Sequence, residues 1–516
     1  MAEPCAAGRG KRSLCAAVLL LLLAVAAALY LPHAGIPYYA DDYLFRPVDP
    51  WAGLFGYFGP LVVPNNFRPL QMSWIAVNLL LFGESTFALQ AGQVIAHVLL
   101  AGVVYWFLRH RGLGLTASLL AAVWLAAAQI AVPAILGNDT GSQVGATLFG
   151  FAGFVLAWQY AAAQLASSPI NRPQRWMAVG SILALAIALL WKETALSFAG
   201  ILTFVLLYFV AMARRSSPPA PVGRLLLLAA GVVALTAAYF GYRETVVSLR
   251  VAYGRSSPYA FHVGGNVPII IALLPAGALL PVSSAEIAAA IQGRVVPQLV
   301  GAGLLFTLWI GVLAAGITLA RAWRAAFGWL FLAACATVPM CLLIHPSELY
   351  SYNVLPFVAI VVGIGLGGLL DRRRALWLRA AGALVFAAVL VSNAIAVQQK
   401  AACMGHNGAA TAAMLPQVVE VARKLPPGGR LLLYEQDQPD FHRYSVFYTT
   451  DFHGLNAAEP WIQRWAGRPD IAVRIRDALL RGRRDLETTR LLAWADTVLI
   501  RDDATWPPTV RVKPNP

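Results

Sequence analysis

The sequence predicts a polytopic α-helical membrane protein of about eleven transmembrane helices, followed by a small soluble α/β domain. Of the 516 residues, 59% are hydrophobic and only 12% are charged, and the mean hydropathy is +0.66. Soluble proteins carry about 25% charged residues, so a cytosolic enzyme, a disordered chain and a disulfide-stapled secreted module are excluded. The apolar residues also form runs long enough to cross a bilayer, and the composition becomes polar only after about residue 400.

Each apolar run is expected to be a helix, because lipid requires every backbone N–H and C=O to find its partner inside the segment. The first run has the position of a secretory signal, but its apolar stretch is long and no convincing small-x-small cleavage site follows. We therefore expect a retained anchor. The runs are 14–31, 86–108, 115–135, 141–163, 176–191, 194–212, 223–243, 298–320, 326–344, 353–370 and 380–397.

Basic residues in the loops orient these helices. If the N-terminus is cytoplasmic, the inner loops carry Arg109 and Arg111, Arg172 and Arg175, Arg214 and Arg215, Arg321 and Arg324, and Arg372 to Arg374. The short outer turns 136–140 and 345–352 contain no Lys or Arg, as the positive-inside rule requires. The net charge of +15 is then explained by loops facing an anionic leaflet, and no nucleic-acid partner is expected. This predicts a multi-pass inner (plasma) membrane protein with a cytoplasmic N-terminus and an extracytoplasmic C-terminal domain.

The expected domains are a transmembrane domain, 1–400, and an extracytoplasmic α/β domain, 401–516. In the second domain a helical pattern at 409–424 leads through a Pro-Pro-Gly-Gly turn into a strand at 430–434, and another strand is expected at 496–500.

Two long outer loops are expected, 32–85 and 244–297. The second contains an apolar stretch, 267–282, whose three prolines argue against a continuous spanning helix. This stretch is expected to be a helix on the membrane, a re-entrant segment or a short hairpin.

Charged side chains beside apolar runs are costly, so each is a candidate for function. Asp41 and Asp42 lie between aromatic residues in the first outer loop, and an acidic pair suits a general base with a supporting acid or metal ligand. Arg68 opens a Trp- and Leu-rich stretch, 69–82, that can lie in the interface. Its guanidinium can snorkel to headgroups or bind a phosphate.

Lys192 and Glu193 separate two apolar runs. The run before them, 176–191, reaches only ~24 Å at ~1.5 Å per residue, which is short of the ~30 Å hydrocarbon core. The pair is therefore expected at the outer surface facing a cavity, or else as an ion pair that closes a tight hairpin. The other outer candidates are Asp139, Arg243, Arg250, Arg255, His345, Glu348, Tyr350 and Tyr352.

Together these residues place carboxylates and cations on the outer face of the membrane. The combination suits a reaction that needs a base and a stabilised anionic leaving group, for which a lipid phosphate is the obvious candidate.

The acidic pair after the first run, the long first outer loop and Arg68-Pro69-Leu70 before the second run resemble the GT-C membrane glycosyltransferases. The resemblance is to the protein O-mannosyltransferases and the tetratricopeptide-bearing transmembrane O-mannosyltransferases, with their bacterial relatives. Lys192-Glu193 and Glu348 to Tyr352 resemble later outer-loop motifs of that branch. The likeness covers roughly residues 14–400, and the chain lacks the tetratricopeptide repeats.

The resemblance implies inverting transfer of a sugar from a polyprenyl-phosphate donor to an acceptor hydroxyl on a protein, lipid or glycan. Asp41 would be the base, with Asp42 as the second candidate. Donor phosphate would be held by Arg68, Lys192 and one of Arg243, Arg250 or Arg255. Asp139, Glu193, His345, Glu348, Tyr350 and Tyr352 would support substrate binding, with Glu193 orienting Lys192.

A divalent metal, Mg²⁺ or Mn²⁺, is compatible with this activity but not required by the sequence, with Asp42 and Glu348 as its candidate ligands. Two alternatives remain open. One is a transporter or flippase for polyprenyl-linked lipids, and the other is a non-catalytic membrane assembly protein.

Overall fold

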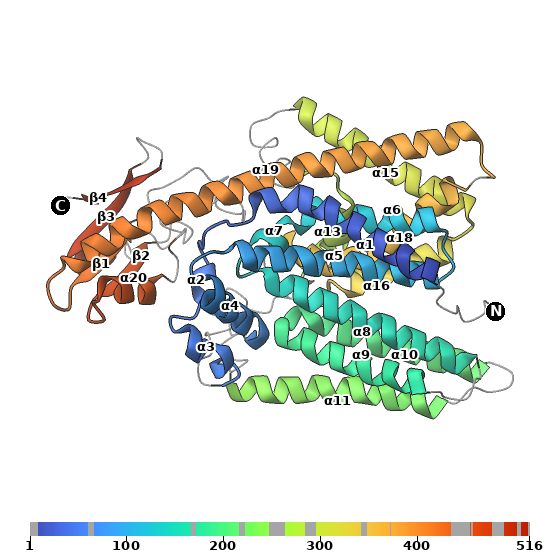
Figure 1. The fold of residues 1–516 in the computed structure, drawn as a ribbon, viewed down its shortest axis with the longest axis horizontal. Coiled ribbons are helices and arrows are strands. Elements are labelled where there is room, and N and C mark those ends of the chain that lie inside the picture. Colours follow the sequence, from blue (N-terminus) through green and yellow to red (C-terminus); the bar gives the residue numbers. More distant parts are fainter. Residues whose placement is uncertain are drawn as a thin grey trace.

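A computed structural model shows a bundle of long helices with a small sheet domain at one end and the N-terminus at the other (Figure 1). The structure describes residues 9–59, 67–166, 172–215, 222–246, 264–283, 296–341, 348–371, 373–434, 455, 458–476, 490–502 and 507–513.

Nine helices within these residues are long and apolar enough to cross a membrane, which confirms the predicted membrane architecture. They are built on α1 (Arg9–Tyr30), α5 (Phe87–His110), α8 (Gly141–Leu165), α9 (Arg172–Trp191), α10 (Leu196–Arg215), α11 (Val222–Val246), α15 (Val296–Leu319), α18 (Leu355–Leu369) and α19 (Leu376–Arg423).

Two of the eleven predicted spans differ from expectation. The run 115–135 is a broken pair, α6 (Leu115–Ala126) and then η2 (Gln129–Ala131) with α7 (Val132–Leu136), bent by 42°. Pro133 lies in the first turn of α7, where its missing N–H is tolerated. In the run 326–344, α16 (Trp323–Cys335) has only 13 residues, and α17 (Val338–Cys341) follows a break. Counting the bent pair, the described part of the chain therefore holds ten candidate spans.

Short helices lie at the end of the bundle that adjoins the sheet domain (Figure 1). They include α2 (Asp42–Phe45), α3 (Pro50–Gly56), α4 (Pro69–Phe82), η3 (Glu193–Ala195) and η4 (Glu348–Val354). The apolar stretch 267–282 forms a 14-residue helix, α13 (Asn266–Leu279), with Pro275 inside it. It buries Ile270 and Leu274 and packs against η4 and α17, so this stretch is a short helix rather than a hairpin.

The last helix, α19, joins the bundle to the sheet domain. Its 48 residues extend ~72 Å at ~1.5 Å per residue, more than twice the ~30 Å hydrocarbon core of a bilayer. The predicted helix 409–424 is its final portion, and the change of composition near residue 400 falls inside it.

The sheet has the order β2-β1-β3-β4, in which β1 is parallel to β2 and β3, and β4 is antiparallel to β3. Its strands are β1 (Arg430–Tyr434), β2 (Ala472–Arg476), β3 (Thr497–Asp502) and β4 (Thr509–Lys513), and α20 (Glu459–Ala466) precedes β2. The two predicted strands correspond to β1 and β3, and the predicted α/β class is confirmed.

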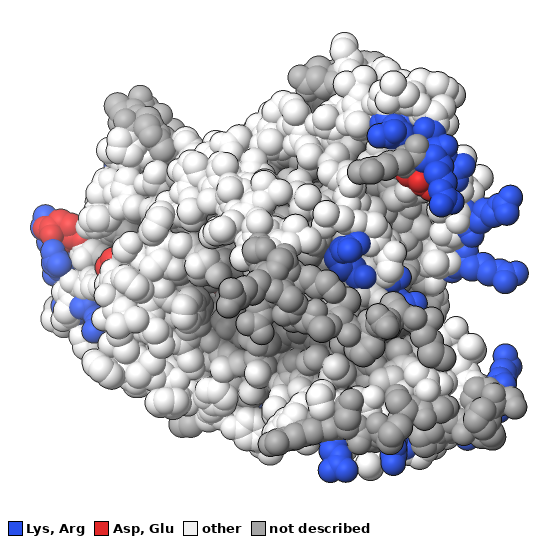
Figure 2. Space-filling model, turned by 45° about the vertical axis from the view of Figure 1, so that its right-hand side comes forward, with Lys and Arg blue, Asp and Glu red and all other residues white. Residues whose placement is uncertain are grey.

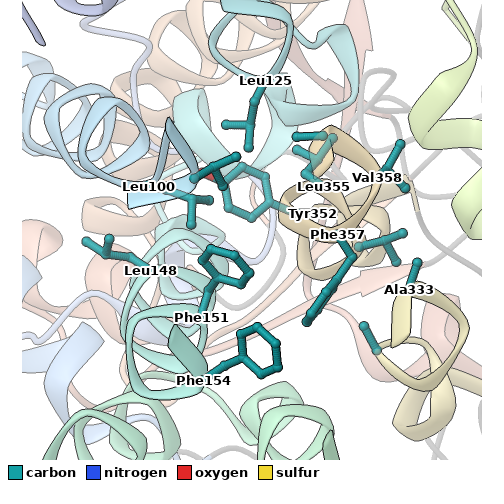
Figure 3. Close-up of a cluster of buried hydrophobic side chains, with 14 of the residues drawn as sticks. Leu100, Leu125, Leu148, Phe151, Phe154, Ala333, Tyr352, Leu355, Phe357 and Val358 are labelled. Atoms are coloured by element: carbon teal, nitrogen blue, oxygen red, sulfur yellow. The ribbon is translucent and has the colours of Figure 1, made fainter. Parts of the chain in front are cut away.

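Two large hydrophobic cores contain most of the buried apolar side chains, and a third, small one lies in the sheet domain. The larger core fills the bundle with aromatic and aliphatic side chains, among them Phe151, Phe154, Tyr352 and Phe357 (Figure 3). The second core joins Tyr38, Tyr43 and Phe45 of the first outer loop to Val418 of α19 and Trp461 of α20. The sheet domain and the first outer loop therefore share one core.

Exposed arginines gather at the opposite end of the bundle (Figure 2). Arg109 lies in the last turn of α5, and Arg214 and Arg215 lie in the last turn of α10. The predicted inner loops thus meet at one end of the molecule.

Three glycines let α15 and α18 approach each other closely. A Cβ added at Gly316 would lie 1.8 Å from the carbonyl oxygen of Gly365, and one added at Gly368 would lie 2.0 Å from the carbonyl oxygen of Gly316. Small residues allow such backbone contact between helices in lipid, where close van der Waals packing drives association.

Gly316→Ala is therefore expected to lower the unfolding temperature of the detergent-solubilised protein, because overpacking costs about 1–3 kcal/mol. Gly311→Ala is the matched control in the same helix, since nothing lies within 4 Å of its added Cβ. The control should unfold at or slightly above the wild-type temperature, because Ala favours a helix over Gly by about 1 kcal/mol. Equal unfolding temperatures for the two variants would contradict the close α15–α18 contact.

Candidate active site

The centre of the bundle end that adjoins the sheet domain is the buried carboxylate of Asp42, at the start of α2. Its Oδ2 accepts hydrogen bonds from the Tyr39 N–H at 3.0 Å and from Asn138 Nδ2 at 2.9 Å, and its Oδ1 accepts one from the Asp139 N–H at 2.8 Å. Burial, and then the charge of Asp139, raise the pKa of Asp42 well above its ordinary value, while these three donors oppose the shift. Asp42 thus ties the first outer loop to the turn before α8.

An unusual backbone conformation makes this contact. Ala40 has a φ of +53°, in the left-handed region that non-glycine residues seldom adopt. Such strain persists only where surrounding structure enforces it, and it is concentrated at functional sites. Here it turns the chain so that the Tyr39 N–H faces the Asp42 carboxylate, while Asp41 between them stays half-buried.

The side chain of Gln90 in α5 forms hydrogen bonds with the backbone of the same loop. Its Oε1 accepts from the Gly35 N–H at 2.7 Å, and its Nε2 donates to the Ile36 carbonyl at 3.1 Å and to Asn138 Oδ1 at 2.9 Å. Asn138 in turn donates to Asp42. A continuous set of hydrogen bonds therefore runs from a spanning helix through two loops to the acidic pair.

A second charged pair faces this cluster. Arg68 and Glu193 form a fork with distances of 3.0 Å between Nη2 and Oε1 and 3.3 Å between Nε and Oε2. Arg68 is almost fully buried and also lies over the ring of Phe45, 4.9 Å from its centroid. The pair contradicts one expectation, because Glu193 holds Arg68 rather than its sequence neighbour Lys192.

Lys192 is the most buried cation of the cluster, with 2% of its surface exposed. Its Nζ lies 5.6 Å from the centre of the Tyr350 ring. Burial, followed by the charge of Arg68, lowers the pKa of Lys192, and the carboxylates of Glu193 and Asp139 oppose that change. Binding an anion here would offset the cost of burying two cations so close together.

Asp139 links the two halves of the cluster. Burial and the charge of Asp41 raise its pKa, and the charges of Lys192 and Arg68 lower it. The side chain of Gln71 in α4 donates to its backbone carbonyl. Asp41, Asp42, Arg68, Asp139, Lys192 and Glu193, which the sequence predicted to share one face, are thus neighbours in the structure.

The remaining predicted site residues lie in α11, in the core or outside the described residues. Arg243 is buried near the end of α11, whose Tyr239 and Tyr242 pack against Phe67 beside Arg68, with ring centroids 6.0 and 5.7 Å away. Tyr352 lies in the core (Figure 3) and not on the cluster. Its hydroxyl pairs with His97 Nδ1 at 2.7 Å. Arg250, Arg255, His345 and the side chain of Glu348 lie outside the described residues.

Several residues of this region had no signal in the sequence. Asn353 has Nδ2 3.2 Å from the Thr194 carbonyl, and its Oδ1 accepts from Thr147 Oγ1 at 2.6 Å, which fixes η4 against the turn after Lys192. Arg46 forms an ion pair with Glu84 and lies over the ring of Trp461 at 4.0 Å. These partners are distant in sequence, so only the fold reveals them.

The donor set for a metal is weak in the residues that the structure describes. They contain no group of three or more His, Cys, Asp or Glu side chains placed to hold a metal ion. Both oxygens of Asp42 already accept N–H hydrogen bonds. A metal ligated by Asp42 and Glu348 therefore stays a prediction.

Comparison with known proteins gives the fold. No family model matches the chain, and no curated protein sequence matches it. Among solved structures, ArnT from Cupriavidus metallidurans in the apo state is similar, with a TM-score of 0.50 and 17% identity over 94% of this chain and 92% of that chain. The oligosaccharyltransferase AglB from Archaeoglobus fulgidus gives a TM-score of 0.51 and 13% identity over 95% and 70%. The predicted GT-C-like fold is thereby confirmed.

We expect Asp42→Asn to lower the unfolding temperature of the purified protein, because its amide would face donors that need an acceptor. Leaving a buried donor unsatisfied costs about 1–3 kcal/mol. Asp49→Asn is the control in the same loop, since exposed Asp49 caps α3 by accepting from the Trp51 N–H, and Asn caps a helix equally well. An Asp42→Asn protein as stable as Asp49→Asn would show that the three donors do not need the carboxylate.

Proposed function

We propose that this protein is an inverting glycosyltransferase that moves a sugar from a polyprenyl-phosphate donor to an acceptor hydroxyl at the outer face of the membrane. The observation that supports the proposal is the charged cluster around Asp139, whose carboxylate interacts with the charge of Asp41 and with those of the buried cations Lys192 and Arg68. A base and an anion site within one cluster suit attack by a hydroxyl and departure of a phosphate.

The comparisons support the class of donor. AglB, which has a similar fold, is an oligosaccharyltransferase whose structure was solved with an inhibitory peptide and a dolichol-phosphate. A transferase acting outside the cell also has no supply of nucleotide sugars, so its donor must be carried across on a lipid. The narrower resemblance to the protein O-mannosyltransferases remains part of the proposal, and the sugar is left open.

In the proposed mechanism, Asp41 accepts the proton of the acceptor hydroxyl. The hydroxyl oxygen attacks the anomeric carbon from the face opposite the phosphate, and the carbon–oxygen bond to the phosphate breaks with its electrons on the leaving oxygen. Lys192 and Arg68 stabilise that charge at a buried site, where electrostatic interactions are stronger than in water. Asp42 positions the loop, and Glu193 holds the Arg68 fork.

Three further arginines are proposed to extend the phosphate site. Arg243 lies on α11, which packs against Phe67, and Arg250 and Arg255 follow it in the second outer loop. A metal, if bound, would add positive charge near the leaving phosphate.

Asp41→Asn is expected to reduce turnover of a polyprenyl-phosphate sugar by about 10²–10⁴-fold, the usual contribution of a general base. The measurement is release of polyprenyl phosphate from radiolabelled donors by purified protein, with Asp49→Asn as the control for a neighbouring charge change. Full turnover by a folded Asp41→Asn protein would remove Asp41 from the mechanism. Absence of turnover in the wild type, with tight donor binding, would favour a lipid carrier instead.

We further propose that the cluster faces the outside of the inner membrane, with the N-terminus and the exposed arginines of Figure 2 in the cytoplasm. Single cysteines test this in a chain whose five native cysteines are replaced. Lys424→Cys, exposed at the end of α19, should react with a membrane-impermeant maleimide in intact cells. Arg111→Cys, exposed after α5, should react only after permeabilisation. The reverse labelling pattern would invert the topology.

A further inference from the structure

A cavity lies beside the loop that carries the acidic pair. It has a volume of about 500 Å³ and lies between the first outer loop, the residues before α5, the outer part of α19 and α20. Small-molecule sites occupy about 300–1,000 Å³, so this volume is large enough for a ligand. The cavity is lined by Pro37, Tyr38, Tyr43, Arg46, Glu84, Ala412, Leu415, Pro416, Val419, Arg423 and Trp465.

The walls combine flat apolar faces with a few fixed polar groups. Tyr38, Tyr43 and Trp465 contribute aromatic rings. The Arg46 guanidinium lies 4.7 Å from the centre of the Tyr38 ring and 5.3 Å from that of Trp465, so planar groups stack here. Arg46 is 4% exposed, and its Nε has no hydrogen-bond partner in the described structure. Stacking on these rings holds the Arg46 guanidinium in the wall of the cavity.

Each arginine that lines the cavity has a carboxylate partner. Arg46 is paired with Glu84 inside the cavity. Arg423 is paired at 3.3 Å with Glu420, which lies outside the lining and is also paired with Lys424. The buried guanidinium in the cavity wall, that of Arg46, is therefore already neutralised by a carboxylate. A neutral sugar fits this cavity, because its C–H face can pack on aromatic rings while its hydroxyls bond to the carboxylate and guanidinium groups at the rim.

The cavity is also close to the acidic pair. Tyr38 and Tyr43 flank Asp41 and Asp42 in the chain, and the charge of Asp42 acts on the hydroxyl of each tyrosine. A molecule bound between Tyr43 and Trp465 would thus lie next to the loop that carries Asp41.

We propose that this cavity binds a neutral saccharide unit of the acceptor, so that the acceptor is a glycan or a glycan-bearing lipid and not a bare peptide. The role as acceptor site rests on the proposed transferase function, whereas saccharide binding can be measured without it.

The test uses the full-length protein in phospholipid nanodiscs, free of sugar-based detergent. Binding of maltose, cellobiose and chitobiose is measured by saturation-transfer NMR and titration. At least one disaccharide should bind the wild type, Trp465→Ala should weaken that binding by about tenfold or more, and Trp465→Phe should keep most of it. Trp494→Ala is the matched control, because Trp494 is also half-buried in the sheet domain but packs with Arg474 away from the cavity.

Two results would overturn the saccharide site: no disaccharide binds the wild type, or Trp465→Ala binds as tightly as Trp494→Ala does. Donor hydrolysis without acceptor separates the two proposals, since Trp465→Ala should leave it unchanged and Asp41→Asn should reduce it by about 10²–10⁴-fold. Binding of a sugar without any donor turnover would support the saccharide site and contradict the proposed transferase function. Donor turnover without binding of a sugar would contradict the saccharide site and support the transferase function.

Discussion

The bundle end beside the sheet domain depends on the burial of one carboxylate, that of Asp42. A buried charge is tolerated only when hydrogen bonds replace the water that it has lost. Here the donors come from Tyr39 in the same loop and from the Asn138-Asp139 turn between α7 and α8. Because Gln90 of α5 holds Asn138 and the loop at once, the position of Asp41 is set by a spanning helix rather than by the loop alone.

The same requirement explains how two cations come to lie beside the carboxylates. Arg68 is held in a fork by Glu193, which both compensates its charge and fixes its direction. Burial is the main cause of the lowered pKa of Lys192, and the charges of Glu193 and Asp139 oppose that shift. Both cations therefore lie among carboxylates, at the position that the proposed function assigns to the leaving phosphate.

The sequence predicts the parts of this arrangement that follow from local pattern. Nine of the predicted spans appear as single helices because hydropathy measures what lipid requires, and Asp41, Asp42, Arg68, Lys192 and Glu193 stand out as charges beside apolar runs. The hydrogen bonds of Gln90 and Asn138 could not be predicted from local pattern, because they join residues that are distant in the sequence. Gln90 and Asn138 are 48 residues apart, and Asn138 and Asp42 are 96 residues apart. The break in the third span could not be predicted from hydropathy either, because a bend leaves the apolar composition of the run unchanged.

The C-terminal domain packs against the first outer loop through a shared hydrophobic core. Composition separates it from the membrane domain near residue 400, yet α19 runs unbroken through that point and its outer residues Met414 and Val418 share a core with Tyr38 and Tyr43. Arg46, only a few residues after Asp41 and Asp42, stacks on Trp461 of α20. The loop that carries Asp41 and Asp42 is thus packed between the bundle on one side and the sheet domain on the other. A displacement of the sheet domain would open the second core, so the domain is coupled to the loop by the cost of exposing apolar surface to water.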